Sequence, residues 1–177
     1  DLTQGKPFSV LLKFAIPVIL GNLFQLFYTL ADSVIVGKTM GAGALAAVGS
    51  TSIIIYFIFC FINGFTGGFG ICLGQRFGAR DQKGMTKSIA VSAVLCVLFT
   101  IVLTAVCCLL AHPILRWMQI PADIYDDAYT YMFIVLAGTG ATIYYNMISN
   151  MLRALGDSKT PLYFLVFSSL LNIVLDV

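Results

Sequence analysis

Two aspartates of this sequence lie inside apolar stretches, where a charged side chain is costly. Asp32 lies near the end of the stretch at residues 10–36, and Asp176 lies near the end of the stretch at 161–177. An ionisable group at membrane depth costs ~2.5–3.5 kcal/mol on insertion scales, so it persists where it faces protein or water. These two carboxylates are therefore the first candidates for a functional site.

The first aspartate ends a row of polar side chains. Asn22, Gln25 and Thr29 precede Asp32 at intervals of three or four residues. In a helix this spacing places all four on one face. Asn22 and Gln25, together with Tyr28, are candidates to line a substrate cavity beside this polar stripe.

The second aspartate has a similar neighbour and a similar expected depth. Asn172 precedes Asp176 by four residues and shares its helical face. Asp176 lies 15 residues after Pro161, about 22 Å along a helix, so both carboxylates should occupy the same half of the bilayer. Carboxylate and amide oxygens hold hard cations such as Na⁺. The same acids could bind a proton instead, and the alternative is that each aspartate only hydrogen-bonds between helices.

Two further features bear on this site. The stretch at residues 125–152 carries polar donors at Tyr131, Tyr144, Tyr145, Asn146 and Asn150. Pro17, in the first stretch, removes a backbone hydrogen bond and should kink or loosen its helix. A helix that bends at Pro17 and carries Asp32 would act as a gate, although a static kink is equally compatible with the sequence.

The composition defines the elements that must position these residues. Hydrophobic residues make up 59% of the 177 residues and charged residues 10%, whereas soluble domains carry roughly 25% charged residues. This excludes a soluble enzyme, a nucleic-acid-binding protein and a disordered tail. A membrane span needs about 20 mainly apolar residues, and the windows that meet or approach this length are 10–36, 45–73, 88–111, 125–152 and 161–177. The predicted fold class is an all-α integral membrane helix bundle.

Basic residues give the expected orientation, because they are enriched in cytoplasmic segments. Eight of the ten lie in alternate segments, namely Lys6, Lys13, Arg76, Arg80, Lys83, Lys87, Arg153 and Lys159. The N-terminus is therefore expected in the cytoplasm. The chain begins at Asp1 and stops inside an apolar run, so we expect it to be a piece of a longer protein.

Turn and packing signals lie between and within the stretches. The segments 74–81 and 153–161 mix Gly, Asp and basic residues, which is typical of turns in which Asp or Ser caps the next helix. The spacings Gly64-xxx-Gly68 and Gly70-xxx-Gly74 favour close helix contact over phosphate binding.

Taken together, these motifs resemble the multidrug and toxic compound extrusion (MATE) family. The segments that carry the resemblance are Ala31-Asp-Ser-Val-Ile-Val-Gly37, Leu45-Ala-Ala-Val-Gly49, Gly74-Gln-Arg-Phe-Gly-Ala-Arg-Asp81, Arg153-Ala-Leu-Gly-Asp-Ser-Lys-Thr-Pro161 and Leu171-Asn-Ile-Val-Leu-Asp176. They occur in the family's order over essentially all 177 residues and cover five of its twelve helices.

The resemblance implies a secondary antiporter, not an enzyme, built from two six-helix lobes. Such proteins exchange Na⁺ or H⁺ for organic cations, drugs or metabolites, without a cofactor, across the plasma membrane. The family's N-lobe cation site falls on Asp32, Asn172 and Asp176, which would also be the Na⁺ ligands. The family's Tyr and Asn on the fourth helix fall on Tyr131 and Asn150.

The expected partners are a small organic cation, the lipid bilayer and the missing C-terminal lobe of the same chain, with no nucleic acid. Aromatic residues such as Phe24, Phe27, Tyr28 and Phe61 could line the cavity for a flat cation. Two alternatives stay open: a lipid-linked oligosaccharide flippase of the same superfamily, and a cation channel. The fragment alone is not expected to transport.

Overall fold

The structure is a computed structural model that describes residues 7–39 and 41–175. Within them the chain forms α1 (Pro7–Thr39), α2 (Gly41–Gly78), α3 (Gln82–Trp117), α4 (Tyr125–Ala137), α5 (Thr139–Ala154) and α6 (Lys159–Leu175). The predicted all-α bundle is confirmed. The candidate site residue Asp176 lies outside the described residues.

The first three helices are longer than the apolar windows that predicted them. α1, α2 and α3 contain 33, 38 and 36 residues, and each is long and apolar enough to cross a membrane. Their ends extend into polar sequence because a helix continues until a turn signal stops it, and hydropathy alone does not stop it. α6 contributes 17 described residues, somewhat fewer than the roughly 20 that a membrane span needs.

The window at 125–152 was expected to be one helix, but it is broken. α4 and α5 meet at Gly138 with a bend of 43°, and only the two together are long and apolar enough to cross a membrane. The physical cause is local: Gly138 weakens the helix, and the Thr139 hydroxyl donates to the Val135 carbonyl at 3.4 Å, a back-bond that bends helices. At Gly140 a side-chain Cβ would come within 2.9 Å of Thr100 on α3, so the bent segment approaches α3 closely.

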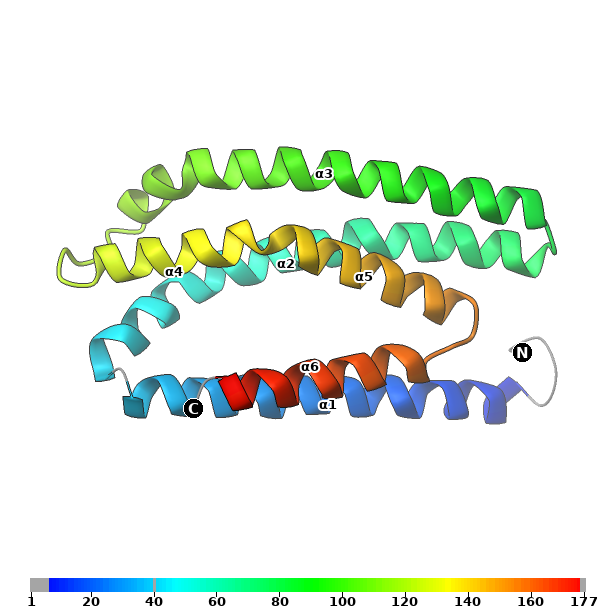
Figure 1. The fold of residues 1–177 in the computed structure, drawn as a ribbon, viewed down its shortest axis with the longest axis horizontal. Coiled ribbons are helices and arrows are strands. Elements are labelled where there is room, and N and C mark those ends of the chain that lie inside the picture. Colours follow the sequence, from blue (N-terminus) through cyan, green and yellow to red (C-terminus); the bar gives the residue numbers. More distant parts are fainter. Residues whose placement is uncertain (1–6, 40, 176–177) are drawn as a thin grey trace.

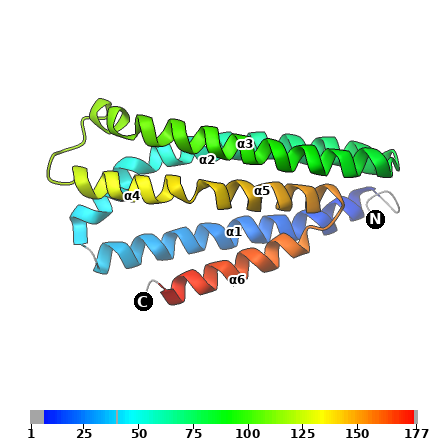
Figure 2. The same cartoon turned by 45° about the horizontal axis from the view of Figure 1, so that its top comes forward.

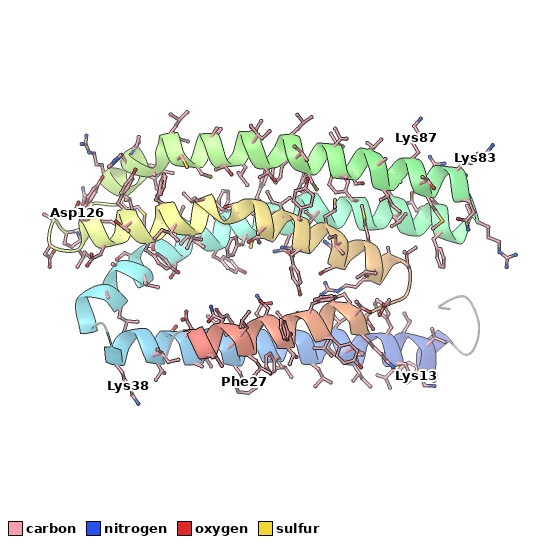
Figure 3. All side chains as sticks on the ribbon, viewed as in Figure 1. Lys13, Phe27, Lys38, Lys83, Lys87 and Asp126 are labelled. Carbon is pink, nitrogen blue, oxygen red and sulfur yellow. The ribbon has the colours of Figure 1, made fainter. Side chains whose placement is uncertain are left out.

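The helices form two groups along the long axis of the bundle. α1 and α6 run parallel and pack together along one side, and α3 covers the other side of the α2–α4–α5 group (Figures 1 and 2). In the described part of the chain α1 packs against α2 and α6, and α2 has its largest interface with α5. One end of the bundle contains the start of α1 and the α2–α3 and α5–α6 turns; we call it the basic end, because most lysines and arginines lie there (Figure 3).

The α2–α3 turn at the basic end is capped as the sequence predicted. The Asp81 carboxylate accepts a hydrogen bond from the Gly84 backbone N–H at 2.9 Å and another from Arg76 Nη1 at 3.0 Å. The bond from Gly84, with a smaller contribution from Arg76, lowers the pKa of Asp81 below its usual value. The cap fixes the start of α3 against the end of α2.

The close contact of α2 with α5 depends on small residues, as the glycine spacing indicated, but only at one of the two motifs. A Cβ at Gly70 would lie 3.0 Å from the Asn150 carbonyl oxygen, and one at Gly74 would lie 3.7 Å from the Ala154 Cβ. By contrast, a Cβ at Gly64 or Gly68 would meet no atom within 4 Å. The α2–α5 seam therefore runs through Gly70 and Gly74.

We expect Gly70→Val to destabilise the protein by about 1–3 kcal/mol, the usual cost of overpacking. The carbonyl oxygen opposite Gly70 belongs to a helix backbone, which cannot rotate away as a side chain would. Thermal unfolding of the purified protein in detergent measures the effect as a lower midpoint. Gly64→Val, in the same helix but facing open space, is the matched control, and equal midpoints for the two variants would contradict the proposed seam.

Candidate functional site: the polar groove along α1

Asp32 of α1 and Tyr131 of α4, two of the predicted site residues, lie within electrostatic range of each other across the groove. Asp32 is half-buried near the end of α1 that lies away from the basic end. Tyr131 of α4, also half-buried, is close enough for the Asp32 carboxylate to act on it electrostatically. A phenol beside a carboxylate supplies both a donor to the anion and an oxygen ligand for a cation.

Asn172 reaches a similar level of the bundle from α6. Gly21 of α1 faces Leu162 and Leu165 of α6. A Cβ atom at Gly21 would lie 3.5 and 3.7 Å from the methyl groups of these two leucines. Since α1 and α6 run parallel, this register puts Asn172 level with the turn of α1 that precedes Asp32 (Figure 1). The Asn172 Oδ1 atom is buried and has no hydrogen-bond partner among the described residues. A buried amide oxygen without a partner is costly unless something coordinates it.

Asn150, the remaining described candidate for cation coupling, lies elsewhere. Its Nδ2 donates to the buried Thr66 hydroxyl of α2 at 3.2 Å, within the α2–α5 seam. Asn150 faces Gly70, which lies 29 residues after the start of α2. α1 runs antiparallel to α2, and Asp32 lies only seven residues before the end of α1. At 1.5 Å per residue the two levels differ by roughly 30 Å. The structure thus places Tyr131, but not Asn150, within electrostatic range of Asp32.

Two adjoining cavities follow the polar stripe of α1. The wide cavity, of about 540 Å³, lies between α1, α2 and α4, and its lining is Asn22, Gln25, Leu26, Thr29, Ser52, Ile55, Tyr56, Phe59, Cys60, Asn63 and Tyr131. The polar cavity, of about 100 Å³, lies nearer the basic end, and its lining is Pro17, Val18, Gly21, Asn22, Gln25, Asn63, Tyr145, Asn146, Ser149, Arg153, Ser158, Pro161, Leu162 and Leu165. Asn22, Gln25 and Asn63 border both cavities, so the two form one groove.

The aromatic lining of the wide cavity differs from the sequence prediction. Phe27 is 68% exposed and points away from the other helices (Figure 3). The ring of Phe61 packs against that of Phe99 of α3, with centroids 5.8 Å apart and the planes tilted by 37°. Tyr28 and Phe24 are half-buried on α1 and are not among the residues that line either cavity. Those four positions were therefore poor guides to the cavity.

Sequence reasoning missed the face of α2 that completes the groove. Ser52, Tyr56, Phe59 and Asn63 recur at intervals of three or four and all border the wide cavity. The same spacing rule that identified the stripe on α1 would have identified them. Because α2 is so apolar overall, its few polar side chains were harder to recognise as a set.

Pro17 lies inside α1, which continues as one helix from Pro7 to Thr39 (Figure 1). Its ring leaves the Lys13 carbonyl without the usual helical donor. Pro17 also borders the polar cavity. Pro17, the predicted weak point of α1, therefore lies next to the groove, in the same helix as Asp32 but nearer the start of that helix.

The turn between α5 and α6 sets the start of the helix that carries Asn172. Gly156 has φ +91°, a left-handed conformation that favours glycine. Asp157 then accepts hydrogen bonds from the backbone N–H groups of Lys159 and Thr160, both at 3.0 Å, and from the Thr160 hydroxyl at 2.6 Å. These bonds, with the Thr160 hydroxyl the largest contributor, lower the pKa of Asp157. The predicted cap is confirmed, with Pro161 in the first turn of α6.

Long apolar helices that pack around a polar groove define a polytopic helical membrane protein. The model of one family, MatE, matches residues 17–177. The chain belongs to this family, whose members are membrane transporters rather than enzymes.

Relatives of this chain are named as multidrug resistance proteins or as MATE proteins. The chain is 38% identical over 175 residues to the "Probable multidrug resistance protein YpnP" of Bacillus subtilis (strain 168), which covers 99% of this chain and 39% of that protein. The crystal structure of a proline-to-alanine mutant of a MATE protein superposes with a TM-score of 0.90 at 28% identity, over 99% of this chain and 39% of the other. A crystal structure of MATE "in the bent conformation" has a TM-score of 0.88 at 28% identity, over 97% and 38%. The chain thus spans about two fifths of the length of the proteins it matches.

We expect Asp157→Ala to lower thermal stability at neutral pH by about 1 kcal/mol, the usual value of a lost helix cap. Because the folded-state pKa of Asp157 is lowered, its stabilisation is present above the unfolded pKa, roughly 3.9, and is lost as pH falls through the folded value. Unfolding midpoints of wild type and variant should therefore converge at acidic pH.

Asp123→Ala, at an exposed position outside the helices, is the matched control for this cap. It should leave the midpoint unchanged over the same pH range. A constant difference between wild type and Asp157→Ala down to acidic pH would show that the carboxylate does not supply the stabilisation.

Proposed function

We propose that this chain supplies five of the six helices of the N-terminal lobe of a secondary antiporter that exports organic cations, drugs or metabolites in exchange for Na⁺ or H⁺. The observation that carries the proposal is the approach of Tyr131 and Asn172 to the level of Asp32 beside a polar groove in a MatE-family chain. A carboxylate and a buried amide oxygen are oxygen ligands that hard cations prefer, and the Tyr131 phenol adds a polar group beside them. Asp176, which precedes the end of the chain by one residue, completes the predicted Na⁺ ligand set.

The wide cavity supports an organic cation as the exported substrate. Tyr56, Phe59 and Tyr131 present aromatic rings, whose faces attract cations. Asn22 and Gln25 add neutral polar groups that orient a ligand without a strong charge. A volume of about 540 Å³ lies within the range of small-molecule sites.

Exchange follows if cation and substrate favour different arrangements of the lobe. A ligand shifts a conformational equilibrium only by its difference in affinity for the two states. We propose that the coupling cation at Asp32 favours one arrangement and that substrate in the wide cavity favours the other. The two ligands then compete through α1, which borders both sites.

The proposed location is the plasma membrane, with the N-terminus in the cytoplasm. The described lysines and arginines concentrate at the basic end, and basic residues mark the cytoplasmic side of membrane proteins. In this orientation the Asp32 level lies in the outer half of the bilayer and the polar cavity in the inner half.

The decisive variant is Asp32→Asn in the full-length parent protein. In inverted membrane vesicles, uptake of a fluorescent organic cation is driven by a Na⁺ or proton gradient directed out of the lumen. We expect Asp32→Asn to reduce uptake at least about tenfold, because the loss of a bond to a charged group exceeds the 1.4 kcal/mol that corresponds to tenfold. Asp176→Asn should have the same effect.

Asp126→Asn, which removes an exposed carboxylate at the start of α4 (Figure 3), is the matched control and should transport normally. The gradient that drives uptake identifies the ion. Uptake that survives Asp32→Asn would refute the coupling site. Ion flux without exchange would favour a channel, and transport of lipid-linked sugar without a gradient would favour a flippase.

Pro17→Ala tests whether α1 must deform during exchange. Alanine restores the hydrogen bond to the Lys13 carbonyl and stiffens α1. We expect the exchange rate to fall several-fold while the affinity for the coupling cation stays unchanged, since Asp32 is not touched. Stopped-flow uptake measures the rate, and a cation titration of thermal stability measures the affinity. An unchanged rate would mean that the proline is only a static feature of α1.

A further inference from the structure

Arg153 places a positive charge at the end of the groove farthest from Asp32. It lies at the C-terminal end of α5 and borders the polar cavity. Its Nε atom is buried and has no hydrogen-bond partner in the described part of the chain. A guanidinium is always charged, and a buried donor of a charged group is costly unless it is paired.

The rest of the polar cavity lacks a negative charge to pair with it. Among its described lining residues there is no Asp or Glu. The neutral groups that share the cavity and can donate are the amides and hydroxyls of Asn22, Gln25, Asn63, Asn146, Ser149 and Ser158. The Tyr145 hydroxyl also borders the cavity, but it donates to the Pro161 carbonyl at 3.4 Å. Asn63 and Asn146 each use one amide hydrogen on a helix carbonyl, at 2.9 and 2.8 Å, and keep a second for a ligand.

A second, wider space adjoins the polar cavity on the side of the basic end. This entrance cavity, of about 430 Å³, is bordered by Val10, Lys13, Phe14 and residues 155–159. It shares Ser158 with the polar cavity and carries Lys13 and Lys159 at its mouth. The Asp157 carboxylate also borders it, but the start of α6 already donates three hydrogen bonds to that group. The net charge along the route is positive, which raises the local concentration of anions.

We propose that the polar cavity is an anion site in which Arg153 binds a carboxylate or an inorganic anion of similar size. The anion accepts charge-assisted hydrogen bonds from Arg153 and neutral ones from Asn22 and Gln25 of α1. It thereby connects α5 and α6 to the segment of α1 that contains Pro17. The anion site requires neither the coupling ion nor transport, so it is separate from the proposed antiport.

Size limits the ligand. The polar cavity of about 100 Å³ corresponds to roughly three water molecules at 30 Å³ each. Chloride or a carboxylate group fits, whereas a whole drug molecule does not. Two sources share this chemistry: a free small anion, and the carboxylate of a larger ligand whose body occupies the adjoining wide cavity.

The test uses the purified full-length protein and measures its thermal unfolding midpoint as chloride or acetate replaces a bulky sulfonate at constant ionic strength and pH. The site predicts saturable stabilisation by both small anions, as binding to the native state requires. Arg153→Gln should raise the half-saturating concentration at least about tenfold, since it removes a charge-assisted bond. Arg153→Lys should retain part of the effect, and Arg80→Gln, an exposed arginine at the same end, should retain all of it.

A second arm separates the two sources. Equilibrium binding is compared for a rhodamine with a free carboxylate and for its methyl ester, each in wild type and Arg153→Gln. Tighter binding of the carboxylate form that is lost in Arg153→Gln assigns the site to a ligand carboxylate. Equal binding of both forms, with chloride stabilisation intact, assigns it to a free anion. The proposal is overturned if neither small anion stabilises wild type and both dyes bind equally, or if Arg153→Gln and Arg80→Gln respond alike.

Discussion

Polar side chains on a membrane helix must face protein or water, and this constraint organises the fold. Asn22, Gln25, Thr29 and Asp32 form one face of α1 that hydrocarbon cannot solvate. α2, α4 and α5 supply the opposing wall, and α6 packs alongside α1. The polar face of α1 therefore requires a groove, and the other helices line one side of it, while Asn22, Gln25 and Thr29 stay exposed within the described part of the chain.

The walls of the groove differ in how firmly they are held. α2 and α5 meet through Gly70 and Gly74 with backbone nearly in contact, and the Asn150–Thr66 hydrogen bond crosses the same interface. Within the described part, α1 packs only on α2 and α6. The α2–α5 seam thus gives a firm base, and the α1–α6 pair is the side of the groove with fewer restraints. A binding site with ligands on both the α1–α6 pair and the α2–α5 side therefore depends on how these two groups of helices are placed relative to each other.

Much of this could be predicted from the sequence, because membrane spans and caps depend on local composition and spacing. The stripe on α1, the Asp81 and Asp157 caps and the small residues at Gly70 all follow local rules. The break at Gly138 was missed because hydropathy continues through it without interruption. The position of Asn150 depends on which helix α5 faces, a tertiary choice that no spacing within α5 encodes.

The three residues that border both cavities have a consequence for how this protein can change. Asn22, Gln25 and Asn63 shape the wide and the polar cavity at once, so a mutation at any of them alters two binding spaces together. Ser52, Tyr56 and Thr29 border the wide cavity alone. Natural variation that broadens the range of ligands in the wide cavity without disturbing the polar cavity around Arg153 should therefore accumulate at Ser52, Tyr56 and Thr29. Asn22, Gln25 and Asn63, which border both cavities, should evolve slowly.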